Sequence, residues 1–312
     1  MVSSAPVNGT SGVCPNAVAF ATFGEAMNPS TISASTFMLT GPGATPVMGQ
    51  VAYDAPDYVA TFTPSGNLAL STTYTVTVTT GAKDLLGDPM ATDFTWSFTT
   101  SAVACQTSSV PLGSAANFVV LAGSTVTNTG PTTITGGDLG LSPGSAVTGF
   151  PPGTLVSPAV MHITDPTAAQ AELDLTTAYV YTAGLAGGAV LPGDMSGLTF
   201  APGLYTTSST VVLSAGNVTL DAQGDANAVF IFQVGSTLTT IGSTQVILAG
   251  GAQAKNVFWE VASSATLGTN SIFQGTIISL QSITLDTGAT LIGRALARNA
   301  AVTLDSNTVT AP

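Results

Sequence analysis

The sequence predicts a mainly β protein in two parts, an N-terminal antiparallel β-sandwich followed by a triangular β-solenoid with one long α-helix packed along a face. Three observations predict this architecture. Short runs in the first third alternate between polar and apolar residues, a motif near the C-terminus recurs every 18 to 19 residues, and a stretch between them has helical spacing. The expected domains are residues 1–105 for the sandwich and residues 106–312 for the solenoid.

The composition leaves few groups for chemistry or for nucleic-acid binding. The 312 residues include 4 Lys and Arg, 16 Asp and Glu and 1 His, a formal net charge of −12 at pH 7. Charged residues make up 6% of the chain, against about 25% in ordinary soluble domains, whereas threonine occurs 50 times. So few basic residues cannot follow a phosphate backbone, and one histidine with two cysteines offers little for acid–base or metal chemistry. We expect no enzyme activity, no metal or cofactor and no nucleic-acid partner.

The strands expected in residues 15–100 are short and are separated by turn residues. The runs that alternate with period two, rich in Thr, Val and aromatic residues, are 18–23, 59–63, 74–79 and 94–99. Turn signals fall between them at 64–67 and 86–89. Several short strands without a helical period favour an antiparallel sandwich of the Ig-like type.

Three features bear on the compartment in which the protein acts. Cys14 and Cys105 are the only cysteines and bracket the predicted sandwich, which favours a disulfide between them and an oxidising compartment. Two buried free thiols are the alternative. No basic segment opens the chain, so a secretion signal is expected to lie outside it. No apolar run approaches the ~20 residues of a membrane span.

The C-terminal repeat determines which side chains we expect inside the solenoid. A Thr-Leu pair at 266–267 recurs at 284–285 after 18 residues and at 303–304 after another 19. A repeat of this length with three short strands in each turn is typical of a triangular β-solenoid. Alternate side chains of a strand point to opposite faces, so the apolar positions are expected inside. These inward positions are Leu238, Leu267, Ile283, Leu285, Val302 and Leu304.

Two outward faces follow from this alternation, and both are candidate binding surfaces. The first, the threonine column, consists of Thr237, Thr239, Thr266, Thr284 and Thr303, with Thr219 expected upstream. The second, the mixed face, consists of Ile272, Gln274, Thr290 and Ile292, with Phe273 and Leu291 pointing inward. Thr269 and Thr287 are expected near the corner and suit either face. Asp286 and Asp305 stand beside the threonine column, whereas the mixed face carries no charge.

The third strand type is apolar on both sides and therefore needs a cover. Residues 164–188 supply it, because Asp165 suits a helix N-cap and Pro166 suits the first helical position. The positions that then recur at spacings of three and four are Ala168, Ala171, Leu175, Ala178, Thr182 and Leu185. We expect one helix over about 166–186, ended by Gly187 and Gly188, lying along this apolar face.

Parts of the first domain resemble a known family. The matching segments are FGEAMNPSTI at 23–32, TTYTV at 72–76, GAKDL at 81–85 and WSFTT at 96–100. They resemble the bacterial Ig-like domains of surface and secreted proteins. The resemblance implies a spacer or adhesion module and leaves a cell-surface or protein partner open. Glu25 and Asp84 would suit a cation, but solvated loop acids are the expectation.

A second resemblance covers residues 110–310. The segments that carry it are LGSAANFVVLA at 112–122, GGDLGLSPG at 136–144, FAPGLY at 200–205, DANAVFIFQ at 225–233, GRALA at 293–297 and AVTLDSNTV at 301–309. They resemble the ice-binding proteins of bacteria and microbial eukaryotes. The resemblance implies a discontinuous β-solenoid, in which an N-terminal segment packs beside later coils and the helix lies between them in sequence.

The resemblance implies that the chain is secreted or displayed at the cell surface and adsorbs to ice, which is its partner. It leaves open which face binds, because known members often bind through an irregular one. The alternative is an adhesin for a cell surface or polysaccharide, although Trp96 is expected in the sandwich and Trp259 on the covered strand, away from sugars. A polysaccharide-degrading enzyme would need clustered acids. His162, beside the helix, is expected to be a loop or cap residue rather than a metal ligand.

Overall fold

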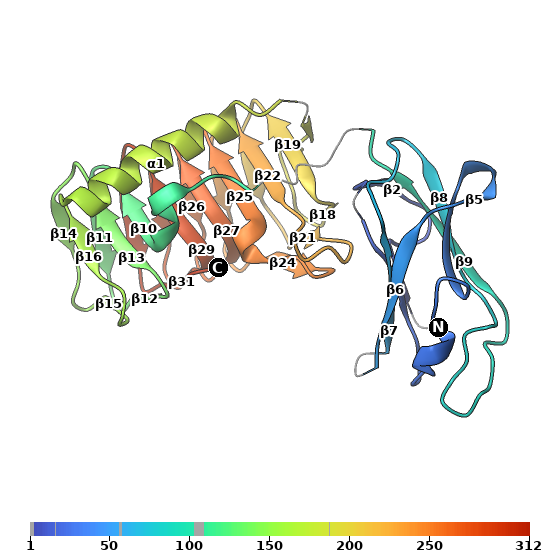
Figure 1. The fold of residues 1–312 in the computed structure, drawn as a ribbon. Helices are drawn as coiled ribbons and strands as arrows, with labels where there is room; N and C mark the ends of the chain where they lie inside the picture. Colours follow the sequence, from blue (N-terminus) through green and yellow to red (C-terminus); the bar gives the residue numbers. More distant parts are fainter. Residues whose placement is uncertain (1–2, 16, 56–57, 103–108, 187) are drawn as a thin grey trace. The chain divides into compact units, whose positions relative to one another are not determined.

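The computed structural model describes residues 3–15, 17–55, 58–102, 109–186 and 188–312 (Figure 1). Within these residues the protein is mainly β with one α-helix. It divides into two compact units, the first holding residues 1–105 with 221–226 and 249–252, and the second holding the rest. Short 3-10 helices are η1 (Pro29–Thr31), η2 (Pro42–Ala44), η3 (Gly113–Asn117) and η4 (Ala254–Asn256).

The first unit contains two β-sheets. One has the strand order β1 (Ser3–Ala5), β3 (Ala19–Thr22), β7 (Val59–Pro64) and β6 (Gly49–Asp54). The other has the order β2 (Thr10–Val13), β9 (Phe94–Thr100), β8 (Thr73–Val78), β4 (Phe37–Gly41) and β5 (Thr45–Pro46). Neighbouring strands are antiparallel except β2 and β9, which are parallel.

Alternation along these strands places one side of each sheet in a shared core. Trp96 and Phe37 are buried with ring centroids 6.1 Å apart, and Phe62 lies 6.1 Å from Phe37 on the other side. The core therefore joins the two sheets through aromatic contacts. Cys14 is buried, and the disulfide predicted for it remains a prediction because Cys105 lies outside the described residues.

The second unit is built from parallel strands that stack side by side (Figure 1). One sheet, the column ladder, contains the strands that carry the threonine column. Its order is β14 (Ala146–Thr148), β11 (Thr125–Thr129), β30 (Val302–Asp305), β28 (Ile283–Leu285), β26 (Ala265–Leu267), β23 (Leu238–Thr240) and β20 (Val211–Leu213). The positions predicted to point inward on β23, β26, β28 and β30 are buried. The alternation predicted for these strands is therefore confirmed.

A larger parallel sheet supplies two further strand stacks. Its main path is β15 (Thr154–Leu155), β12 (Thr133–Thr135), β31 (Thr308–Thr310), β29 (Thr290–Ala297), β27 (Ile272–Ser279), β25 (Val257–Val261), β22 (Phe230–Val234), β19 (Gly203–Thr207) and β17 (Ala189–Val190). Strands β10 (Phe118–Ala122), β13 (Asp138–Leu141) and β16 (Met161–Ile163) branch from it, with β10 paired to β29. A separate sheet has the order β18 (Thr199–Phe200), β21 (Val218–Asp221) and β24 (Val246–Ala249).

Strands β27 and β29 belong to two stacks because a glycine divides each of them. Gly275 (φ 109°) and Gly293 (φ 159°) lie opposite each other, and a Cβ on Gly293 would collide with the Gly275 carbonyl oxygen. Only glycine allows the two strands to approach this closely. Residues before these glycines form one stack with β31, β12 and β15, here called the mixed ladder, and residues after them join the strands beneath the helix.

The helix α1 spans Pro166–Ala183 and runs along the stacked strands (Figure 1). Its buried residues are Ala168, Ala171, Leu175, Ala178 and Thr182, the spacing predicted for its inner face. Of these, Ala171, Leu175 and Ala178 pack in one core cluster with Ile231, Phe258 and Ile278 of the strands below. The Asp165 carboxylate caps the helix by accepting from the Ala168 N–H at 2.8 Å, as predicted. The helix ends earlier than predicted, since Gly184 is its C-cap.

The first strands of the second unit pair with strands close to the C-terminus. Strand β10 pairs with β29, β11 with β30, and β12 with β31. Strands from residues 118–163 therefore extend stacks begun by residues near 300. This pairing agrees with the discontinuous order that the family resemblance implies, and it brings threonines distant in sequence into the same columns.

Candidate functional site

The mixed ladder presents two outward columns of side chains. Parallel pairing aligns the first column as Ile272, Thr290, Thr308, Thr133 and Thr154, and the second as Gln274, Ile292, Thr310 and Thr135. The intervening residues point inward and are fully or almost fully buried: Phe273, Leu291, Val309 and Ile134. The prediction of inward and outward positions on 272–274 and 290–292 is confirmed. The neighbouring strands extend this face with threonines that the repeat in the sequence did not predict.

The chemistry of this face is uniform in one respect, since none of its outward side chains carries a charge. Within the described residues, the hydroxyls of Thr133, Thr290 and Thr308 make no hydrogen bond to the protein; Thr308 is exposed, and Thr133 and Thr290 are half-exposed. Threonine is stiff at χ1, so each hydroxyl and methyl is held in place by the strand. Adjacent strands lie ~4.8 Å apart, and alternate residues along a strand are ~6.7 Å apart. The face is therefore a regular array of fixed hydroxyl and methyl groups.

The threonine column is longer than predicted. Pairing aligns Thr239, Thr266, Thr284, Thr303, Thr127 and Thr148 across β23, β26, β28, β30, β11 and β14. Thr127 and Thr148 were missed because they precede the helix and join the column only through tertiary pairing. A Thr-apolar-Thr pattern at 125–127, similar to that at 237–239, was the available sequence signal.

Two members predicted for the threonine column lie elsewhere. Thr219 pairs with Thr199 in the sheet of β18 and β21, so its placement in the column was wrong. The alternating pattern of β21 resembles that of the column strands and does not show which side of the fold the strand occupies. Thr237 precedes β23, and its carbonyl oxygen accepts a hydrogen bond from the Val211 N–H. It therefore belongs to a second outward column, which runs beside the threonine column and nearer the start of each strand.

Charged groups lie at the corner edge of the column ladder. Asp305 ends β30, and its carboxylate accepts a hydrogen bond from the Thr287 hydroxyl. The Asp286 N–H donates to the Leu267 carbonyl, which continues the ladder past β28. Thr269 and Thr287, which follow β26 and β28, are exposed, and backbone bonds link their positions in the stack; their place at a corner stays a prediction. The corner therefore places carboxylates between the two candidate faces.

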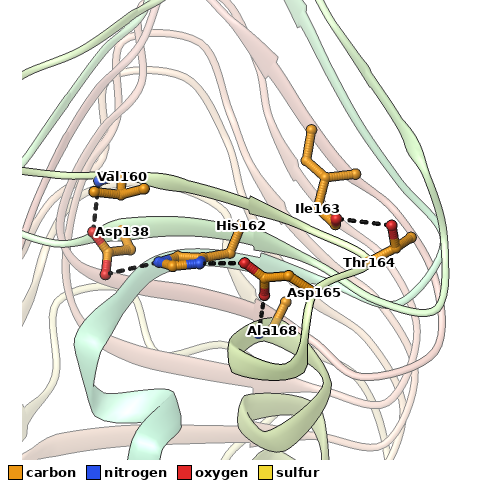
Figure 2. Close-up of polar contacts among 7 residues, drawn as sticks. All are labelled: Asp138, Val160, His162, Ile163, Thr164, Asp165 and Ala168. Atoms are coloured by element: carbon orange, nitrogen blue, oxygen red, sulfur yellow. Dashed lines mark hydrogen bonds and ion pairs between the residues drawn. The ribbon is translucent and has the colours of Figure 1, made fainter.

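His162 lies in β16 between two carboxylates (Figure 2). Its Nδ1 is 2.6 Å from Asp165, and its Nε2 is 3.7 Å from Asp138. The Ala168 N–H, and then the His162 ring, hold the pKa of Asp165 below its usual value. Within the described residues, no group of three or more His, Cys, Asp or Glu could hold a metal ion. His162 is therefore a strand residue rather than the predicted loop or cap residue, and it contacts Asp165, which is the N-cap of the helix.

A second polar cluster lies beneath the helix. Burial raises the pKa of Glu172 to about 8, although the nearby Arg298 opposes the shift. Burial also raises the pKa of Glu260 to about 7, against a hydrogen bond with Tyr179. Arg298 donates from Nε to the Thr176 hydroxyl at 2.9 Å and lies over the Tyr179 ring. This cluster fixes the helix on the strands and is remote from the outward columns.

Comparison with known families identifies the second unit. The ice-binding-like family matches residues 120–310, which is more than half of the chain. The chain belongs to the ice-binding-like family. Residues 1–100 match the bacterial Ig-like domain, in agreement with the two sheets of the first unit. In the described part of the chain, no helix has the length and apolar character needed to cross a membrane.

Individual members of this family align with most of the second unit. An ice-binding protein of Nostoc sp. (strain HG1) is 50% identical over 215 residues, 68% of this chain and 77% of the relative. The crystal structure of an ice-binding protein from an Antarctic biological consortium is 53% identical, with a TM-score of 0.65, and covers 67% of this chain and 94% of its own. The crystal structure of the ice-binding protein from the Antarctic ascomycete Antarctomyces psychrotrophicus is 44% identical, with a TM-score of 0.62. The match covers 66% of this chain and 99% of the ascomycete protein.

Proposed function

We propose that this chain adsorbs to ice through the mixed face and thereby inhibits ice growth and recrystallisation. The observation that carries the proposal is the charge-free, in-register array of outward threonines and isoleucines on the mixed ladder. Membership of the ice-binding-like family supports it. Because the proposed partner is a surface, the function needs no catalytic group.

The mechanism follows from what an ice surface offers. Ice presents uncharged water at fixed spacings, so a protein that adsorbs to it needs fixed groups that hold water in a similar pattern. A stiff threonine presents its hydroxyl and methyl with little conformational freedom left to lose on binding. Adsorbed molecules then force ice to grow as curved fronts between anchors, which lowers the local freezing point.

The proposed scaffold for this array is a triangular β-solenoid. The chain visits the strands below the helix, the column ladder and the mixed ladder in turn, for example at 276–279, 283–285 and 290–292. Left-handed residues at matching corner positions, Asn270, Gly288 and Ser306, support a repeated turn between the last two. Stacked rungs of this kind would keep the mixed face flat.

The mixed face is favoured over the threonine column for two reasons. The column ladder has Asp286 and Asp305 at one edge, and charges order water differently from an ice lattice. Thr127 also donates to Thr303 at 3.3 Å, so part of the column satisfies its own hydroxyls. The mixed face has neither feature among its described outward residues. It is therefore the better primary contact.

The test is a bulky substitution on the mixed face. Thr290→Tyr should abolish most of the thermal hysteresis and recrystallisation inhibition, because the ring holds ice away from neighbouring rungs. Thr177→Tyr, at an exposed position on the outer side of the helix, is the matched control and should keep both activities. Unfolding curves that match those of the parent chain show that each variant is folded. Full activity in Thr290→Tyr would refute the mixed face as the site.

The adhesin alternative receives no support from the relatives, whose names describe ice binding. We propose that the chain acts outside the cell, secreted or at the cell surface, where an ice surface is accessible. The predicted bond between Cys14 and Cys105 is consistent with that location. We further propose that the Ig-like domain is a spacer or a module for a cell-surface or protein partner.

A further inference from the structure

The two sheets of the first unit end in the edge strands β1, β6, β2 and β5, and three of these are poor templates for another strand. Strand β1 has three residues, β5 has two and contains Pro46, and the register of β2 shifts between Ser11 and Val13. Short length, proline and bulged register are features that prevent pairing at an open edge. Strand β6 has none of them, since it pairs regularly with β7 over six residues and contains no Pro, Lys or Arg.

The backbone of β6 has an open side. Pro64, which has no N–H, lies opposite Gly49, and at the next pair the Ser65 N–H donates to the Met48 carbonyl oxygen. Because hydrogen-bonded pairs alternate along an antiparallel ladder, every second residue of β6 bonds to β7, and the residues between direct their N–H and C=O groups away from it. The residues with these outward groups are Gly49, Val51 and Tyr53. Within the described residues, β7 is the only strand that pairs with β6.

The side chains of β6 hold this edge in shape. Val51 and Tyr53 pack against the core that joins the two sheets, and the Tyr53 hydroxyl accepts a hydrogen bond from the Met27 N–H at 2.8 Å. The alternate residues Gln50, Ala52 and Asp54 are exposed. The edge is therefore ordered before any partner arrives, so pairing costs little further conformational entropy.

The exposed side chains of β6 are complementary to those of a second copy of the same strand. In an antiparallel pairing centred on Ala52, the open groups of Val51 meet those of Tyr53 of the second copy. Gln50 then lies opposite Asp54 of the second copy, so the amide can donate to the carboxylate, and no two like charges face each other. A strand of another protein would find the same backbone groups without this match of side chains.

We infer that the first unit is a dimerisation module, in which the β6 strands of two copies pair antiparallel about a two-fold axis at Ala52. The pairing joins the two four-stranded sheets into one. A ladder of this length is shorter than the interface of a permanent dimer, so the association is reversible and depends on the protein concentration. The inference goes beyond ice adsorption and does not depend on it, because β6 lies in the first unit.

The experiment is sedimentation equilibrium of the full chain over a wide range of concentrations. Gln50→Lys places an ammonium group opposite Asp54 of the second copy and should tighten the dimer about three- to tenfold. Gln50→Glu should weaken it by a similar factor, because each cross-strand pair occurs twice in the dimer. Thr95→Lys and Thr95→Glu, at an exposed position of β9 in the other sheet, are the matched controls and should leave the dissociation constant unchanged.

Amide hydrogen exchange then locates the contact. The N–H groups of Val51 and Tyr53 should exchange more slowly in concentrated than in dilute solution, whereas the Ala52 N–H, which bonds to β7, should change little. A chain that stays monomeric at millimolar concentration overturns the inference. So does a dimer whose dissociation constant is the same in both Gln50 variants, or whose Val51 and Tyr53 amides exchange equally fast at both concentrations. Absence of ice binding would overturn the proposed function and leave a dimer of this kind standing.

Discussion

At the residue scale, close packing behind the outward columns is what holds them in place. Leu291 and Val309 are fully buried between the outward threonines and isoleucines of the mixed ladder. Phe273 of the same ladder contacts the Trp259 ring at a centroid distance of 5.0 Å, and Trp259 stacks on Phe232 of the adjacent strand at 4.1 Å. A proposed surface for a crystalline partner depends on such stacking, because a rung that shifts takes its threonine out of register.

Gly293 is the residue at which this packing tolerates least change. A Cβ there would overlap the backbone of Gly275 on the next strand. Gly293→Ala should lower the free energy of unfolding by about 2 kcal/mol or more, the usual cost of forced overpacking with backbone strain. Chemical denaturation of the second unit measures it. Gly193→Ala, whose Cβ would meet its nearest neighbour at 3.6 Å, is the control and should change stability little.

At the element scale, the helix covers the apolar strands, and polar contacts hold both its first turn and its middle in place. Asp165 caps the first turn and contacts His162 (Figure 2). Arg298 donates to the Thr176 hydroxyl from the strands below. The sequence predicted the cap and the inner face. It did not predict the buried Glu172 and Glu260, because their partners come from strands far along the chain.

The helix cap predicts a loss of stability in acid. Because the folded-state pKa of Asp165 is lowered, its contribution is present above the unfolded value of 3.8 and is lost as the pH falls through the folded value. Asp165→Ala should lower the melting temperature at neutral pH and reduce the fall in stability below about pH 4. Asp165→Asn, which keeps an acceptor, should melt closer to the parent chain. Identical melting of Asp165→Ala and the parent at neutral pH would argue against the cap.

The buried carboxylates predict the opposite trend at higher pH. Glu172 and Glu260 have folded pKa values of about 8 and about 7, above the unfolded value of 4.5. Their contribution is therefore complete below about pH 4.5 and is lost as the pH rises through 7 and 8. Glu172→Gln should flatten this decline and raise stability at pH 8 relative to the parent chain. Denaturant titrations of the parent chain and of Glu172→Gln at pH 5 and pH 8 measure how far the free energy of unfolding of each falls with pH. An equal fall in the two chains would contradict the raised pKa of Glu172.

At the scale of the whole molecule, the two units have different roles in the proposal. The solved relative from Antarctomyces psychrotrophicus aligns over 99% of its length with 66% of this chain, so a protein of that extent folds without an Ig-like domain. Threonine strands occur in both units. In the first they fill a sandwich, and in the second they form in-register columns.

Removal of the first unit tests this division. Residues 106–312 alone should keep nearly the full ice affinity and thermal hysteresis of the parent chain at equal molar concentration. The physical reason is that the proposed ice-binding surface, the mixed face, lies on strands of the second unit. Ice-affinity partitioning of the two chains measures it, with matched unfolding curves of the second unit as a control. A large loss in the folded fragment would show that the Ig-like domain contributes to ice binding.

The sequence predicted the parts of the candidate site that repeat locally. Thr266, Thr284 and Thr303 follow from a short period, and strand alternation then places Leu267 and Leu285 inside. Thr133, Thr308 and Thr310 were missed, although both of their strands have a Thr-apolar-Thr pattern. Strand pattern shows which side of a strand is buried. It does not show which strands are neighbours.

By itself, the sequence determined the β-rich character of both units, the helix with its cap, and the alternation that turns threonine outward. The reason is that these features depend on residues a few positions apart. Only the tertiary structure decided that strands of residues 118–155 continue the stacks that end near residue 310. That pairing joins segments about half the chain apart, and the periodicity of side chains along one strand does not show which distant strand lies beside it. The column therefore gains Thr127 and loses Thr219 through long-range packing alone.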